Sequence, residues 1–181
     1  KEFILSKFLV VASFAVASTI FVFIMSLILG YSFSSYNELS IVFTDLEYLF
    51  AFFIKLFAFF SFCLFLGILV KRSAFALGFL FVWFVAENII YWIIKFLILG
   101  GDDKHKNFGD TIIQYFPIEA MSNLVKEPIT RLSAIKTIEN AVGGAQAAKD
   151  YSIHFSQISI VLVWTFIFIL TSYYILKKRD L

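Results

Sequence analysis

Cysteine is almost absent from this chain of 181 residues. The one thiol, Cys63, lies inside an apolar run, so the chain can form no internal disulfide and no cysteine-based metal site. The motifs of common enzymes are missing as well: there is no phosphate-binding G-x-x-x-x-G-K-S/T loop, no H-E-x-x-H and no G-x-S-x-G. We therefore expect the chain not to be an enzyme and to bind no metal or cofactor.

Charged residues are also scarce, at 15%, whereas hydrophobic residues make up 61% of the chain. A soluble globular domain is only about 45–50% apolar, so the composition indicates an integral membrane protein. The period-two alternation of membrane β-strands is absent. The sequence therefore predicts an all-α polytopic transmembrane helix bundle, built as one domain in a lipid bilayer, with no nucleic acid as partner.

Four apolar segments are each long enough to cross a bilayer as a helix. They cover approximately residues 8–30, 46–70, 75–99 and 153–176. The second and third are expected to form a tight hairpin around residues 70–73. The polar stretch 100–152 separates the last two, and within it 111–125 and 128–142 are expected to be helical. His105 lies among aspartates in this stretch, but their spacing fits no metal-ligand pattern, and a solvated loop is the preferred interpretation.

Basic residues near the ends of these segments gather on one side of the predicted bundle. They are Lys1, Lys7, Lys71, Arg72, Lys177, Lys178 and Arg179. The short loop 31–45 on the other side has no Lys or Arg. By the positive-inside rule, both ends of the chain are cytoplasmic and the stretch 100–152 lies outside the cell.

Glu87 lies near the middle of the third apolar segment, too deep for its side chain to reach water, and is followed by Asn88. Tyr91, one turn further on, is close enough to hydrogen-bond with it. One interpretation is a buried carboxylate, neutral or paired with Lys55, that holds the bundle together. The other is a polar group that lines a translocation path or a subunit seam.

Two further features allow two interpretations each. Lys55, in the second segment, can extend toward the outer surface or pair within the bundle, or it can contact a substrate. Ser13 and Ala17, in the first segment, form a pair of small residues four positions apart that permits close helix approach. That pair serves either ordinary packing within the bundle or a contact between two copies.

Three stretches, in this order and topology, carry a resemblance to a known family. Residues 1–8 (KEFILSKF) are similar to a basic segment that leads from a cytoplasmic coupling helix into a span. Residues 115–124 (YFPIEAMSNL) are similar to an outer segment that starts with an aromatic residue and a proline, and 174–181 (YILKKRDL) to a basic tail. The chain resembles the permease subunit of type-2 ATP-binding-cassette (ABC) exporters.

The resemblance implies six spans, of which this chain corresponds to the last four, without the first two spans and the coupling helix. It implies a cytoplasmic ATP-binding subunit that holds ATP and Mg²⁺, and a second permease, either a copy or a homologue. The first two spans seen here would line the path, and Lys1, Glu2 and Lys7 would lie close to the ATPase. The expected location is the cytoplasmic (inner) membrane of a bacterium.

A second function remains open at this point. The chain would then be a non-transporting assembly or anchoring subunit that holds an extracytoplasmic partner through its outer helices. An intramembrane enzyme is a third class, disfavoured because no two intramembrane acids stand at catalytic spacing.

Overall fold

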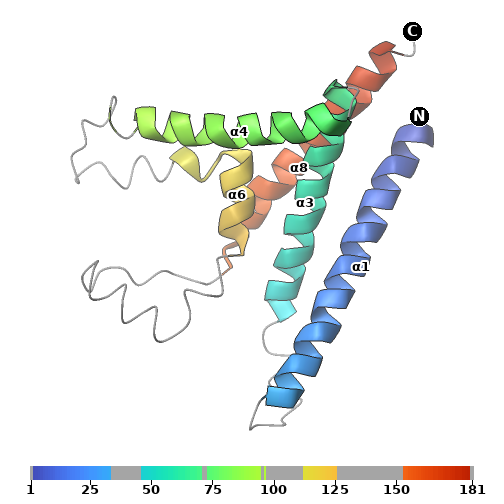
Figure 1. Ribbon diagram of the computed structural model, residues 1–181, viewed down its shortest axis with the longest axis vertical. Coiled ribbons are helices and arrows are strands. Elements are labelled where there is room, and N and C mark those ends of the chain that lie inside the picture. Colours follow the sequence, from blue (N-terminus) through green and yellow to red (C-terminus); the bar gives the residue numbers. More distant parts are fainter. Residues whose placement is uncertain are drawn as a thin grey trace.

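The computed structural model describes residues 2–33, 46–70, 73–94, 96, 112–125 and 153–179. Helices account for nearly all of these residues, and none of them lies in a strand. The helices are, in chain order, α1 (Glu2–Phe33), α3 (Leu46–Val70), α4 (Ser73–Ile93), α6 (Pro117–Leu124) and α8 (Phe155–Arg179) (Figure 1).

Four of the helices are long and apolar enough to cross a membrane. The candidate spans are Leu5–Ser32, Leu46–Val70, Phe75–Ile93 and Phe155–Lys178. The fifth helix, α6, is short and directly precedes the last span in the described part of the chain. The expected fold class, a polytopic helix bundle with a partly helical segment before its last span, is confirmed.

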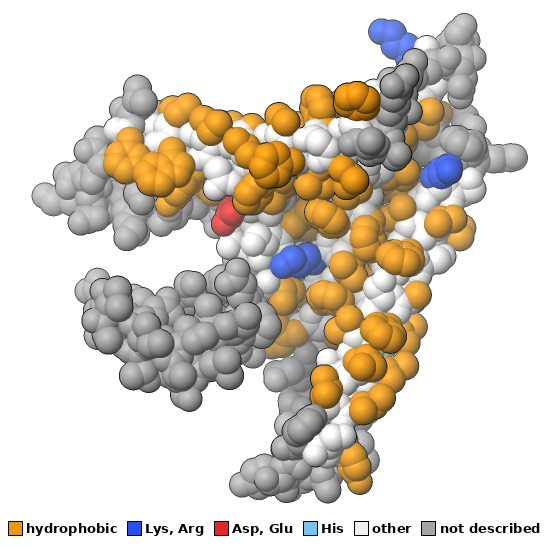
Figure 2. All heavy atoms as spheres, viewed as in Figure 1, with side chains coloured by type: hydrophobic (Ala, Val, Ile, Leu, Met, Phe, Trp, Pro, Cys, Tyr) orange, Lys and Arg blue, Asp and Glu red, His pale blue; other side chains and the backbone are white. Residues whose placement is uncertain are grey.

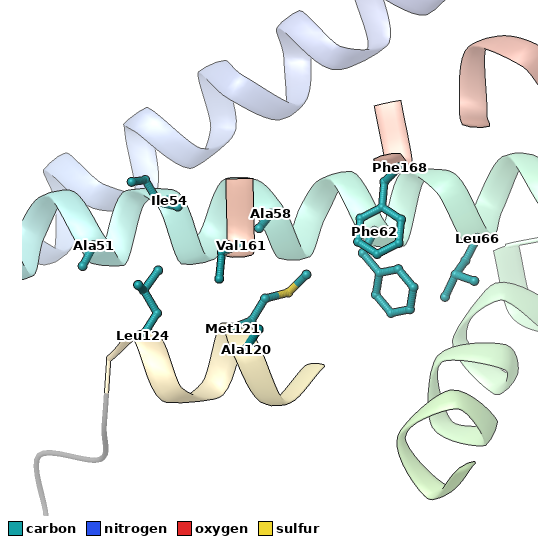
Figure 3. Close-up of a cluster of buried hydrophobic side chains, with 10 residues drawn as sticks. All are labelled: Ala51, Ile54, Ala58, Phe62, Leu66, Ala120, Met121, Leu124, Val161 and Phe168. Atoms are coloured by element: carbon teal, nitrogen blue, oxygen red, sulfur yellow. The ribbon is translucent and has the colours of Figure 1, made fainter. Parts of the chain in front are cut away.

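Helix α3 lies at the centre of the bundle and contacts α1, α4, α6 and α8. Its buried side chains recur every three or four residues, which places them on one stripe of the helix. Ala51, Ile54, Ala58, Phe62 and Leu66 follow one another along it (Figure 3). The small alanines let α6 and α8 approach the α3 backbone closely, while the larger residues fill the space between.

Aromatic rings join three of the spans near the end of α3 that leads into α4. The ring of Phe62 lies 4.8 Å from that of Phe168 on α8 and 5.6 Å from that of Trp83 on α4, measured between centroids. Trp164 stacks on Phe168 at 5.7 Å. Such ring pairs stabilise a core beyond the area that they bury.

Helix α1 lies along α3 and buries little of its surface. Ala15 and Thr19 are buried, and Phe14 meets Phe60 of α3 with ring centroids 5.3 Å apart. Ser13 and Ala17 are exposed, so the close approach within this chain uses a neighbouring pair of small residues. Ser13 and Ala17 therefore do not form the contact of α1 with α3, and packing against another part of the bundle or against a second copy stays a prediction.

Helix α4 does not fold back along α3, although α3 ends at Val70 and α4 begins at Ser73. In Figure 1 it leads away sideways from the end of α3. Hydrophobic side chains cover much of α4 and α1 on the face that Figure 2 shows. None of the most hydrophobic window of α4 is buried, against 28% for α3. The expected tight hairpin of two antiparallel spans is therefore wrong. Helix α6 packs along α3 and α8 instead, while Ala76, Leu80 and Trp83 of α4 contact the same cluster from the side.

Candidate functional site

Helix α6 lies beside the spans and not beyond their ends. Its apolar side, formed by Pro117, Ala120, Met121 and Leu124, is buried. Ala120, Met121 and Leu124 belong to one cluster with the alanines of α3 and with Val161 of α8 (Figure 3). A short polar-flanked helix is thereby seated among apolar helices, where its free backbone groups need partners because no water replaces them.

The beginning of α6 has no side-chain cap of its own. Its N-cap residue, Phe116, has extended backbone angles and makes no capping hydrogen bond, and Pro117 follows at the start of the helix. Proline is favoured there because it has no N–H to leave unsatisfied. The next two amides, of Ile118 and Glu119, still need acceptors, because the first N–H groups of a helix have none within it.

The carboxylate of Glu87, in α4, supplies these acceptors. The N–H of Ile118 donates to Oε1 at 3.3 Å and the N–H of Glu119 donates to Oε2 at 3.4 Å. The indole N–H of Trp83, one turn earlier on α4, donates to Oε1 at 2.7 Å. The two amide contacts are long for hydrogen bonds. The attraction between the carboxylate and the positive end of the α6 dipole contributes to the contact as well.

Lys55, on α3, meets the other end of α6. Its Nζ donates to the carbonyl oxygen of Val125 at 3.1 Å. Val125 is the C-cap residue of α6, where carbonyl groups are left without a helical partner. The two intramembrane charges therefore contact opposite ends of α6, and these contacts differ from the direct pairing of Glu87 with Lys55 that was one interpretation of the sequence.

The signs of the two charges match the dipole of α6. A helix carries about +0.5 elementary charge at its N-terminus and about −0.5 at its C-terminus. An acid at the first end and a base at the second each stabilise a helix by about 0.3–1 kcal/mol at exposed sites, and by up to about 2 kcal/mol in partly buried ones. Glu87 and Lys55, which we call the α6 clasp, thus bind α6 to α4 and to α3.

A third contact fixes the turn that leads into α6. The indole N–H of Trp164, on α8, donates to the carbonyl oxygen of Tyr115 at 2.7 Å. In the first turn of α6, the N–H of Ala120 donates to the carbonyl oxygen of Phe116 at 2.7 Å. Side chains from α3, α4 and α8 therefore all hold this one segment in place.

A cavity of about 450 Å³ lies between α4 and the segment around α6. One wall is a single face of α4, because its residues are three or four positions apart: Phe84, Glu87, Asn88 and Tyr91. The other wall consists of Ile113, Phe116, Ile118, Glu119 and Asn123. Among the described residues, no group of three or more His, Cys, Asp or Glu could hold a metal ion.

Most of the polar residues selected from the sequence thus meet at one place. Glu87, Asn88 and Tyr91 line the cavity, and the side-chain amide of Asn88 also donates to the carbonyl oxygen of Phe84 at 2.9 Å. Lys55 lies at the far end of α6. Sequence reasoning missed Trp83 and Trp164, although a tryptophan in an apolar segment usually seeks an acceptor for its N–H.

The remaining predictions fall on other parts of the chain. Lys7 lies exposed on α1, and Glu2 begins that helix. Lys1, His105 and the expected helix 128–142 lie outside the described residues.

Together the fold and this site define a polytopic helical membrane protein in which a short helix is held between the spans. A family model described as "ABC-2 family transporter protein" matches residues 3–181, nearly the whole chain. The chain belongs to this family, and its four apolar helices are those of a permease subunit in the membrane. No curated protein and no solved structure matches the chain.

Proposed function

We propose that this chain is the membrane-spanning permease subunit of an ABC exporter. The family match over residues 3–181 is the observation that carries the proposal. A separate cytoplasmic subunit binds ATP with Mg²⁺ and hydrolyses it, and this chain binds no cofactor and has no enzymatic activity of its own. Two permeases pair, as copies or as homologues, and the substrate moves along α1 and α3.

Transport by such a pair requires a bundle with two arrangements that nucleotide biases differently. Two features of this chain support a bundle of that kind. Helix α4 is weakly packed along its length, and its middle is joined to α6 by Glu87. We propose that the α6 clasp keeps the outer segment seated while the spans move, so that Glu87 and Lys55 are anchors and not contacts of the substrate.

The orientation belongs to the same proposal. Both ends of the chain lie in the cytoplasm, in the inner membrane of a bacterium, and the segment around residues 1–7 lies against the ATPase. The distribution of basic residues supports this arrangement. A cysteine introduced as Gly143→Cys should react with a membrane-impermeant reagent from outside, and one introduced as Ser73→Cys only after the membrane is opened. The reverse pattern would overturn the orientation.

The deciding experiment is purification of the protein in a mild detergent, followed by identification of what comes with it. A soluble ATPase in near-equal amount, whose hydrolysis rate changes when the permease is present, is the expected result. Lys7→Glu should weaken this association more than the matched change Lys177→Glu at the other end of the chain. Recovery of an extracytoplasmic protein without any ATPase would favour the anchoring function instead.

A further inference from the structure

The cavity between α4 and α6 combines acidic, amide and aromatic groups. Glu87 and Glu119 come from its opposite walls, and Asn88 and Asn123 add two amides. Phe84 contributes one of its aromatic side chains. Among the described residues that line it, there is no Lys, Arg or His. A cavity with these walls carries a negative potential and offers apolar surface at the same time.

The two acids differ in what they already bind. Glu87 accepts three N–H groups, from Trp83, Ile118 and Glu119, so its oxygens are engaged in capping α6. Glu119 accepts the side-chain amide of Asn123 on Oε1 at 3.1 Å, which orients its carboxylate. Since a carboxylate has room for about four donors, Glu119 has the larger capacity left for a ligand.

The chemistry of the walls decides the class of ligand. An anion is disfavoured by two carboxylates without a basic neighbour among the described lining residues. A metal ion needs several oxygen or nitrogen ligands close together, and no group of three or more His, Cys, Asp or Glu among the described residues could hold one. A positive charge within an organic molecule suits both kinds of wall, because aromatic rings attract cations and isoleucine side chains contact apolar groups.

We infer that the cavity between α4 and α6 binds a hydrophobic organic cation, with Glu119 as the counter-charge and the ring of Phe84 as part of the apolar wall. The inference concerns binding and holds whether or not the bound cation is the molecule that the transporter moves. Its failure is therefore separate from a failure of the proposed function, which the ATPase association tests.

The test is equilibrium binding of radiolabelled tetraphenylphosphonium to the full chain, purified in detergent with whatever subunits accompany it. Tetraphenylborate, an anion of nearly the same shape, is the matched control for charge. We expect saturable binding of the cation that unlabelled cation displaces and the anion does not. Binding of both ions to the same extent would overturn the inference, because the site would then recognise only apolar surface.

Variants locate the site. Glu119→Gln keeps an oxygen for Asn123 and should weaken cation binding about tenfold or more by removing the charge. The matched change Glu47→Gln, on α3 and outside the cavity lining, should leave it unchanged. Phe84→Leu, at an exposed position of α4, should weaken binding by roughly three- to tenfold through loss of the ring.

Phe84→Leu still tests the inference if the Glu119→Gln protein does not assemble, because Phe84 is not a residue of the buried core. If the Phe84→Leu and Glu47→Gln proteins both bind the cation like the unaltered protein, and Glu119→Gln either does the same or does not fold, the inference is wrong.

Discussion

Helices α3 and α4 have similar composition and follow each other in the chain, yet they take different places in the structure. Helix α3 is surrounded by four other helices, whereas the most hydrophobic window of α4 has no buried residue. Hydropathy therefore predicts that both can enter a membrane but not which one forms the centre. In the structure, α6 and α8 pack on the buried stripe of α3 that includes Ala51 and Ala58, whereas the small residues within the α4 span Phe75–Ile93 are not buried.

The largest expected effect is the difference in stability lost when a ring is removed from α3 or from α4. Phe62→Ala on α3 removes a fully buried ring and should destabilise the protein by about 3–5 kcal/mol. Phe81→Ala on α4, where the ring is 66% exposed, should cost less than about 1 kcal/mol. Thermal unfolding of both variants in detergent measures the difference. Equal losses would mean that α4 is packed as tightly as α3, against another subunit if not within this chain.

The next effect concerns the contact between α4 and α6. Glu87→Leu deprives the Trp83 indole and two α6 amides of their acceptor and should destabilise the seating of α6 by roughly 2–4 kcal/mol. Glu87→Gln keeps one acceptor oxygen and should cost much less. The measurement is maleimide labelling of Ala120→Cys, a position that is 3% exposed, in a Cys63→Ala background.

Rapid labelling of Ala120→Cys is expected when Glu87→Leu is also present. Slow labelling is expected with Glu87→Gln and with Glu87 unaltered. If Glu87→Leu leaves Ala120→Cys protected and abolishes only transport, then Glu87 is not an anchor of α6 but a group of the transport path.

A smaller effect is expected at the contact between α3 and α6. Lys55→Met removes one hydrogen bond to the carbonyl of Val125 and one favourable charge, which together are worth about 1–2 kcal/mol. Cysteine labelling at Leu124→Cys, near this end of α6, should rise while labelling at Ala120→Cys changes little. Lys55→Arg, which retains a donor, serves as the control. A uniform rise at both positions would show that α6 is released as one rigid unit.

The smallest effect is expected within α8, at a polar group that the core has left unsatisfied. The hydroxyl of Ser172 is fully buried and, in the described part of the chain, lacks a hydrogen-bond partner. Ser172→Ala should therefore change the unfolding temperature little or raise it slightly. Thr165→Val, which removes a hydroxyl bonded to the carbonyl of Val161, is the comparison and should be mildly destabilising. A marked loss for Ser172→Ala would reveal a partner on another subunit.

The positions and helical character of the spans were predictable because long apolar runs admit few other structures in a membrane. That Glu87 would have hydrogen-bond partners was also predictable, since a mid-span carboxylate needs them. Its partners were not, because the backbone amides of Ile118 and Glu119 leave no mark in a sequence. The tight hairpin was wrong because hydropathy carries no information on the direction that one helix takes relative to the next, nor on the packing of α6 against α3 and α8.

The α6 clasp also sets a constraint on length. Eight residues at about 1.5 Å each place its two ends about 12 Å apart, and α3 and α4 each hold one end. One inserted residue would lengthen α6 by about 1.5 Å and turn one end by about 100° relative to the other. Glu87 and Lys55 would then face the wrong backbone groups. Helix α6 is thus a spacer of fixed size, in which insertions and deletions are harder to accommodate than substitutions on its exposed side.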